Sequence, residues 1–174
     1  MLARNRRGYT LIELVVTVLL IGILASIAIP DYMRSVEVGK ADDAVSTVNM
    51  IGTTNKMFAL DHANVGVSGT FPIAAGGTCG VVACPALGPW TACSLVWCKY
   101  LADQDWGDKP YSYNACTGGG GGGAPIACGA NMTAVANRGG TAAPAPGGAY
   151  VGWGYTVGTS GQITLQGGAP APTY

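Results

Sequence analysis

The sequence predicts an α+β protein: a long N-terminal helix, first hydrophobic and then amphipathic, packs against a small antiparallel sheet in a head with disulfide-stapled loops. Three observations support this prediction. An apolar run begins at Leu11, apolar residues at helical spacing follow it, and short alternating segments between glycines and prolines occupy the C-terminal half. The length of 174 residues suits one domain plus a long helix.

The first element is an apolar run of twenty residues, Leu11–Pro30, in which Glu13 carries the only charge. A helix of this length rises about 30 Å, which matches the hydrocarbon core of a bilayer. Three arginines and no acid lie within the first eight residues. Arginines on one side of a short apolar span hold that side in the cytoplasm, so the sequence predicts a membrane-inserted precursor whose bulk is exported.

Glu13 places a carboxylate near the end of this apolar run, where lipid burial costs free energy. Cleavage of the chain between Gly8 and Tyr9 would create an α-amino group four residues from Glu13, and its pKa of about 8 would keep it mostly protonated. Pairing with the amine of a neighbouring chain would turn an isolated charge into an assembly contact and fix the axial register. The alternative is a glutamate that reaches the headgroups and has no function.

The segment Gly8-Tyr9-Thr10-Leu11-Ile12-Glu13, the short basic leader and Pro30 together resemble the class III signal segment of type IV pilins and pseudopilins. The resemblance covers roughly the first fifty residues. It implies that a prepilin peptidase cuts after Gly8 and N-methylates Tyr9, and that Glu13 pairs with the N-terminus of an adjacent subunit. Tyr9 departs from the usual phenylalanine, which keeps an aromatic ring but adds a hydroxyl.

The resemblance divides the chain into a leader (1–8), a transmembrane or filament-core helix (9–30), an amphipathic helical half (31–62) and a globular head (63–174). An ordinary signal peptide is the competing interpretation. It requires a small-x-small cleavage site after the apolar run, and residues 25–30 contain no clear one. Cleavage there would also discard Glu13.

The helix is expected to continue past Pro30, although proline removes a backbone donor and kinks a helix. The residues between Gly22 and Pro30 are partly β-branched and therefore only moderate helix formers. In the family that the chain resembles, this stretch often loses helicity when the filament forms, so Gly22 and Pro30 mark an expected helix break. The alternative is a passive kink in an intact helix.

An amphipathic pattern follows Pro30 and predicts that one helix extends from about Tyr9 to Asp61, with a break at Asn64–Gly66. This stripe is expected to cover the rest of the same chain. Its residues step by three or four positions: Ala41, Ala44, Val48, Ile51, Asn55 and Phe58.

The head begins with a glycine- and proline-rich segment, 66–94, which is expected to be a loop. The strongest strand signal is the pair Ala149–Val157 and Gln162–Gln166 across the turn Gly158–Gly161, because apolar residues alternate in both segments. Two further strands are predicted at Ser94–Cys98 and Tyr111–Asn114. The six glycines at 118–123 are expected to form a mobile loop, and 141–146 and 168–174 are expected to be exposed and extended.

Six cysteines lie in the exported part: Cys79, Cys84, Cys93, Cys98, Cys116 and Cys128. An even number in an oxidising compartment predicts three disulfides, with fifteen possible pairings. Local pairing is the working interpretation: Cys79–Cys84, Cys93–Cys98 and Cys116–Cys128. A four-cysteine zinc site is the alternative, which the four-residue spacers do not exclude.

The segment from Asp105 to Tyr113 is similar to the Asp-Pro-Trp-Gly-x-Pro-Tyr-x-Tyr segment of many pilin and major-pseudopilin heads, with Gln104-Asp105 in place of Asp-Pro. It reads as a turn that leads aromatic residues into a strand. Its acids and Asp103 could hold calcium, but the spacing does not resemble an EF-hand, and solvated loop acids are the preferred interpretation.

Charge and composition exclude several functional classes. Removal of the leader leaves six basic and nine acidic residues, a net charge of about −3, so no broad basic surface for nucleic acid is expected. Charged residues make up only 10% of the chain and glycines number 28, which is typical of a surface covered by identical neighbours. The single histidine, His62, is expected to lie at the helix end, and no catalytic constellation or phosphate-binding loop is found. The sequence predicts no enzyme, cofactor or metal.

The resemblance and the residues together predict a structural subunit of a type IV pilus filament, inserted in the inner membrane as a precursor and then displayed at the cell surface. The expected partners are further copies of the chain, a prepilin peptidase and the pilus assembly machinery. Two alternatives remain. One is a pseudopilin of a type II secretion system or a minor pilin, and the other is a membrane-anchored binding domain that does not polymerise.

Overall fold

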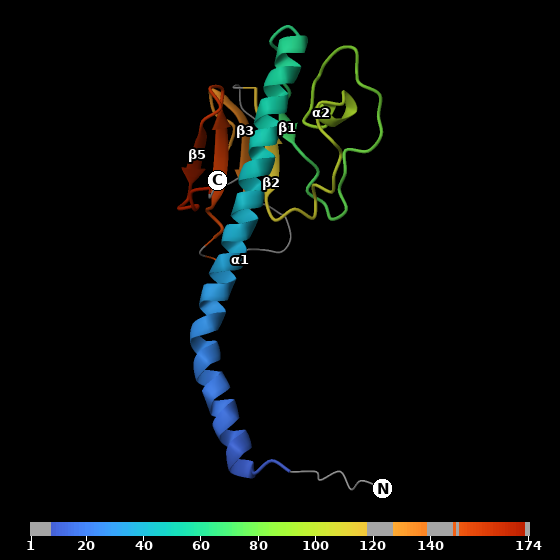
Figure 1. The fold of residues 1–174 in the computed structure, drawn as a ribbon. Coiled ribbons are helices and arrows are strands. Elements are labelled where there is room, and N and C mark those ends of the chain that lie inside the picture. The colour runs from blue at the N-terminus through green and yellow to red at the C-terminus, as the bar shows by residue number, and fades with distance from the viewer. Residues whose placement is uncertain (1–7, 118–126, 139–147, 149, 173–174) are drawn as a thin grey trace, which may run out of the picture. The chain divides into compact units, whose positions relative to one another are not determined.

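The computed structural model describes residues 8–117, 127–138, 148 and 150–172. Its elements follow the order α1, β1, α2, β2, β3, β4 and β5, which confirms the predicted α+β class (Figure 1). The chain divides into two compact units, with the boundary between Val38 and Gly39. The predicted loops at 118–123 and 141–146 and the last two residues of the predicted tail lie outside the described residues.

Helix α1 extends from Leu11 to Asp61, so it begins two residues after the predicted start and ends where predicted. In the second unit, its apolar stripe lies fully buried, which confirms that the amphipathic half covers the head. The residues of the stripe have exposed fractions of 0–2%: Ala41, Ala44, Val48, Ile51, Asn55 and Phe58. The chain leaves the helix through Ala63 and Asn64, which both adopt positive φ angles.

The head contains one antiparallel sheet whose strands lie in the order in which they occur in the sequence. The strands are β1 (Gly69–Thr70), β2 (Ser112–Ala115), β3 (Met132–Asn137), β4 (Gly154–Gly158) and β5 (Ile163–Gln166). The predicted C-terminal pair is confirmed as β4 and β5, in which Tyr155 faces Leu165, but β4 begins at Gly154, five residues after the predicted start, because residues 150–152 form a turn. The predicted strand at Tyr111–Asn114 is confirmed as β2, shifted by one residue.

Strands β1 and β3 were not predicted from the sequence. The first has only two residues within the glycine-rich segment, which is otherwise irregular as expected. The second lies at the centre of the sheet between β2 and β4, and its last five residues are buried. Because both faces of a central strand are covered, its small residues show no alternation of apolar and polar side chains.

The strand predicted at Ser94–Cys98 is wrong: Ser94–Trp97 forms the short helix α2. The Trp97 N–H donates to the Cys93 carbonyl at 3.0 Å, and the Cys98 N–H donates to the Ser94 carbonyl at 2.9 Å. Two cysteines therefore flank a single helical turn. The disulfides of Cys93 and Cys98 hold this short turn in place at both ends.

All six cysteines form disulfides, which excludes the four-cysteine zinc alternative. The pairing of Cys116 with Cys128 is confirmed. The other two predicted pairs are wrong, because the bridges are Cys79–Cys93 and Cys84–Cys98. The first bridge joins the start of the segment 79–84 to the residue before α2, and the second joins its end to the residue after α2. The two bridged segments are therefore linked start to start and end to end. In the chain-entropy model, each bridge stabilises the head by about 2–4 kcal/mol.

Asn55 is the polar centre of the interface between α1 and the sheet, and its exposed fraction is 2%. Its Oδ1 accepts the Val67 N–H at 2.8 Å. Its Nδ2 lies 3.2 Å from the Val67 carbonyl, 3.0 Å from that of Cys116 and 3.0 Å from that of Thr133. One side chain therefore connects the helix with the chain before β1, the chain after β2, and β3.

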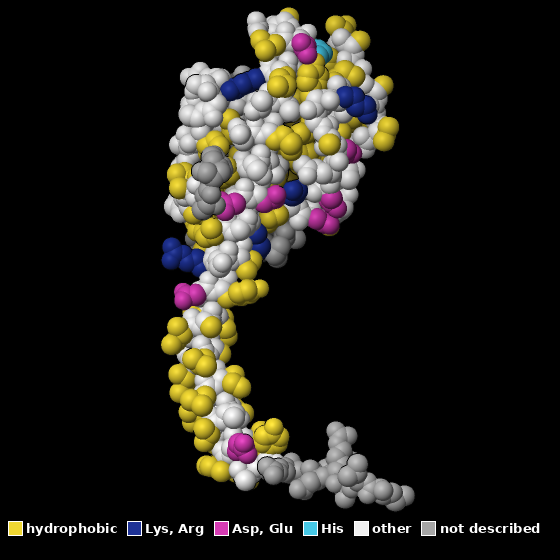
Figure 2. All heavy atoms as spheres, viewed as in Figure 1, with side chains coloured by type: hydrophobic (Ala, Val, Ile, Leu, Met, Phe, Trp, Pro, Cys, Tyr) yellow, Lys and Arg dark blue, Asp and Glu magenta, His cyan; other side chains and the backbone are white. Residues whose placement is uncertain are grey.

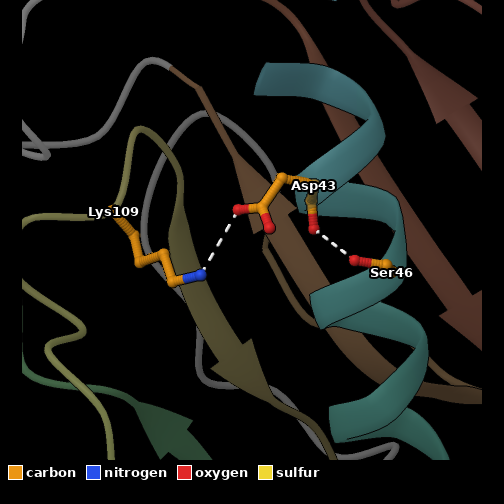
Figure 3. A network of polar contacts seen from close by, with 3 residues as sticks. All are labelled: Asp43, Ser46 and Lys109. Atoms are coloured by element: carbon orange, nitrogen blue, oxygen red, sulfur yellow. Dashed lines mark hydrogen bonds and ion pairs between the residues drawn. The ribbon is translucent and has the colours of Figure 1, made fainter. Parts of the chain in front are cut away.

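A second contact between α1 and the segment before β2 lies at the surface (Figure 3). Lys109 Nζ lies 3.3 Å from Asp43 Oδ2, and the Ser46 hydroxyl donates to the Asp43 carbonyl at 2.8 Å. The side chains of the ion pair are 23% and 49% exposed, so solvent screens it and its contribution is below about 1 kcal/mol.

Buried tyrosines complete the core beneath the helix. Burial raises the pKa of Tyr113 above its ordinary value. Burial, reinforced by the nearby charge of Asp42, raises the pKa of Tyr155 to about 12. A raised pKa means that the folded head favours the protonated phenols, which stabilises the folded state. This stabilisation is complete below the ordinary tyrosine pKa and is lost as the pH rises through the pKa of the tyrosines in the folded head.

Gly52 allows α1 to approach the sheet closely. A Cβ at this position would lie 2.9 Å from Thr133 Oγ1 and 2.9 Å from Val157 Cγ1. We expect Gly52→Leu to destabilise the head by about 2 kcal/mol, because the larger side chain must displace β3 or β4. Near-ultraviolet circular dichroism during thermal unfolding of the detergent-solubilised chain measures this loss, since all four tryptophans lie in the head.

Gly39→Leu is the matched control for this prediction. Gly39 is also a glycine of α1, but a Cβ there would have nothing within 4 Å. This variant should unfold at or above the wild-type temperature, because leucine favours the helix more than glycine does by about 0.8–1.0 kcal/mol. Equal melting temperatures for the two variants would contradict the close approach at Gly52.

Candidate functional site

The N-terminal unit presents an apolar helical surface. The first half of α1 is long and apolar enough to cross a membrane, and none of the apolar window is buried within the chain. Figure 2 shows the hydrophobic side chains along this part of the molecule. Leu11, Leu14 and Leu24 are 80%, 58% and 67% exposed. Such a surface needs lipid or other helices to cover it.

Thr10 marks the start of this helix. Residues 8–10 are not helical, and α1 begins at Leu11. The Glu13 N–H donates to Thr10 Oγ1 at 3.4 Å, and the Leu14 N–H donates to the Thr10 carbonyl at 3.3 Å. Thr10 is therefore the N-cap residue, whose hydroxyl satisfies one of the free N–H groups of the first turn.

The sequence itself carries a signal for this cap. Thr10 and Glu13 match the Ser/Thr-x-x-Glu pattern of a capping box. A carboxylate in the first turn is also favoured by the positive end of the helix dipole. Glu13 thus has a local role at the helix start in addition to the predicted role in assembly.

Tyr9 and Glu13 lie together on one side of the helix start. With Leu14 and Thr17 they line a shallow hollow of about 180 Å³, and Tyr9 is 81% exposed. The hollow thus brings the two predicted assembly residues side by side, although Tyr9 precedes the first helical residue. Cleavage after Gly8 would convert the peptide nitrogen of Tyr9 into an amine beside this face.

The helix passes without interruption through Gly22 and Pro30. A Cβ on Gly22 would have nothing within 4 Å, and Pro30 has no N–H to donate to the Ser26 carbonyl. The Ser26 hydroxyl donates to the Ile23 carbonyl at 2.7 Å in the same stretch. The single chain therefore has a helix with one weakened turn, and the loss of helicity on assembly stays a prediction.

The segment similar to pilin heads forms a buried turn. The Trp106 side chain is 1% exposed and stacks on Phe71, with ring centroids 4.1 Å apart. The backbone N–H of Trp106 donates to the Gly77 carbonyl at 2.9 Å. A Cβ on Gly107 would lie 1.6 Å from the Ala74 carbonyl oxygen, so only glycine fits there.

The aspartates around this segment accept hydrogen bonds from backbone N–H groups of the loops. Asp103 accepts the N–H groups of Cys79 and Gly80, each at 3.1 Å, and Asp105 accepts that of Asp108 at 3.2 Å. In the described part of the chain, no three His, Cys, Asp or Glu side chains form a group that could hold a metal ion. These contacts favour the interpretation of the aspartates as loop acids.

His62 lies directly after the last residue of α1, as predicted. Its ring stacks on Phe58, with centroids 3.9 Å apart, and its Nδ1 lies 2.9 Å from the Phe58 carbonyl oxygen. Trp90 and Tyr100 contact the same ring edge-on, and the Tyr100 hydroxyl donates to Asp61. These contacts give His62 a packing role at the helix end.

Comparisons with known proteins identify the N-terminal segment. The family model of the prokaryotic N-terminal methylation motif matches residues 3–29. The type II secretion system core protein G of Escherichia coli is 31% identical over 88 residues, which are 51% of this chain and 57% of that protein. No solved structure matches the chain.

A type IV pilin and a fimbrial protein also match. The type IV major pilin protein PilA of Myxococcus xanthus is 42% identical over 54 residues, 31% of this chain and 24% of the pilin. A fimbrial protein of Pseudomonas aeruginosa is 38% identical over 67 residues, 38% of this chain and 44% of that protein. The matches thus span between about a quarter and three-fifths of these relatives. With the methylation motif, these partial matches show that part of the chain is similar to a type II secretion core protein G, a type IV major pilin and a fimbrial protein.

Proposed function

We propose that the chain is a structural subunit of a type IV pilus, assembled from the inner membrane by helix packing after leader cleavage. The observation that carries this proposal is the uncovered apolar half of α1, most of which lies within the residues that match the methylation motif. A head folded on its own core leaves this half as the surface that must associate. The partners are further copies of the chain, a prepilin peptidase and the inner-membrane assembly machinery.

Three residues have assigned roles in this proposal. The peptidase cuts between Gly8 and Tyr9 and methylates the new N-terminus. The amine of Tyr9 then pairs with Glu13 of a neighbouring copy, which removes an uncompensated charge from the apolar layer. The exposed position of both side chains at the helix start leaves them free for such a contact.

A pseudopilin of a type II secretion system is the second candidate. The match to the secretion protein of E. coli extends over 88 residues, whereas those to the type IV pilin and the fimbrial protein extend over 54 and 67. Electron microscopy of filaments sheared from intact cells, followed by mass spectrometry of their main protein, separates the two. A pilus subunit is the main component of the surface filaments, and a pseudopilin is absent from them at its natural expression level.

We expect the mature protein to begin at Tyr9 with a methylated amine. N-terminal mass spectrometry of the chain purified from membranes measures this directly, and Gly8→Val is the control, because the peptidase requires a small residue before the cut. A wild-type chain that keeps Met1, or that is cut elsewhere, would overturn the proposed function. It would leave a membrane-anchored domain that does not polymerise.

A further inference from the structure

The proposed cleavage site lies immediately before a defined helix start. Gly8 and Tyr9 are outside regular structure, and α1 begins only two residues after Tyr9. In a helix, the carbonyl and N–H groups of a peptide bond are engaged along the axis and covered by side chains. Proteolysis is concentrated in exposed chain outside such elements, so the position of the helix start decides whether the bond is accessible.

The Thr10 hydroxyl holds the helix start at this position. It accepts the Glu13 N–H at 3.4 Å, while the Thr10 carbonyl accepts the Leu14 N–H at 3.3 Å. An apolar surrounding increases the need for such a cap, because free N–H groups that meet lipid have no water to bind. Without the hydroxyl, the free N–H groups of the first turn gain hydrogen-bond acceptors most simply if the helix extends toward the N-terminus, across the bond between Gly8 and Tyr9.

We propose that Thr10 is a positioning residue for leader cleavage: its side chain caps α1 and thereby keeps the Gly8–Tyr9 bond extended and accessible to the peptidase. This inference rests on the proposed function. The contribution of an N-cap is about 1 kcal/mol. At 1.36 kcal/mol per factor of ten, this corresponds to about a fivefold change in the ratio of the accessible form to the helical form.

The test measures initial rates of leader cleavage of the full-length precursor in membrane vesicles that contain prepilin peptidase. Thr10→Val removes the hydroxyl without changing the shape of the side chain, and Thr10→Ser keeps it. Thr17→Val is the matched control, since the Thr17 hydroxyl donates to the Leu14 carbonyl at 2.9 Å in the same helix but does not cap it.

We expect Thr10→Val to be cleaved more slowly than the wild type, by at most about fivefold, and Thr10→Ser and Thr17→Val to be cleaved at the wild-type rate. A second measurement reports the conformation itself. Carbon-13 chemical shifts of Gly8 and Tyr9 in detergent micelles should be those of an extended chain in the wild type and Thr10→Ser, and should move toward helical values in Thr10→Val.

Each contrary result has one meaning. Equal cleavage of Thr10→Val and the wild type, or unchanged chemical shifts, overturns the capping role while the proposed function stands. Slow cleavage of both Thr10→Val and Thr10→Ser also overturns it, because the peptidase then reads the threonine directly. A wild-type precursor that is not cut after Gly8 overturns the proposed function itself.

Discussion

Glu13→Ala is expected to leave membrane insertion and leader cleavage intact and to reduce filament yield at least about tenfold. In the proposed filament, the carboxylate neutralises the amine of a neighbouring subunit within an apolar layer. Removal of one partner of a buried ion pair costs about 3–5 kcal/mol, because the other charge remains buried without compensation. The substitution does not impair membrane insertion, because it removes a charged residue, and such residues within a membrane span disfavour insertion.

The measurement compares two quantities from the same cells: sheared filament protein and mature subunit in the membrane. Glu13→Gln separates charge from shape and should assemble as poorly as Glu13→Ala. Asp31→Asn is the matched control, because it removes an exposed carboxylate of the same helix just after Pro30. Normal filament yield from Glu13→Gln would show that the charge does not carry assembly.

Asn55→Ala is expected to lower the free energy of unfolding of the head by about 3 kcal/mol. The substitution leaves the buried Val67 N–H without its acceptor and the carbonyls of Val67, Cys116 and Thr133 without the amide donor. Each buried polar group that loses its partner costs about 1–3 kcal/mol, and relaxation of the structure recovers part of the sum.

Thermal unfolding followed by near-ultraviolet circular dichroism measures this effect on the head. Asn49→Ala is the control, because Asn49 is an exposed asparagine of the same helix. It should melt at or above the wild-type temperature, as alanine is the better helix former. A melting temperature of Asn55→Ala close to that of Asn49→Ala would mean that these hydrogen bonds do not hold the helix to the sheet.

Local sequence patterns predicted those helices and strands whose conformation depends on residues close in the sequence. The helical stripe that contains Ile51 and Phe58 predicted α1 to its last residue, and the alternation around Tyr155 predicted the pair β4 and β5. The predicted N-terminal site rests on equally local spacing, that of Gly8, Tyr9 and Glu13, and the roles of these residues stay predictions. The cap at Thr10 was also readable from the sequence.

The parts that were missed depend on contacts between distant residues. The short apolar run at Ser94–Cys98 indicates a strand, but the disulfides of Cys93 and Cys98 hold Ser94–Trp97 as a helical turn. Sequence alone leaves fifteen pairings open for six cysteines. The four hydrogen-bond contacts of Asn55 likewise reach residues up to 78 positions away, which no spacing rule anticipates.

The order of the sheet has a consequence for how the head is made. Among the described residues, each strand pairs only with its neighbours in sequence, from β1 to β5, and no strand has to be inserted later between two earlier ones. A chain that emerges from a translocation channel with its N-terminus anchored can therefore add strands one by one. Such vectorial folding shortens the time during which unpaired edges are exposed to aggregation.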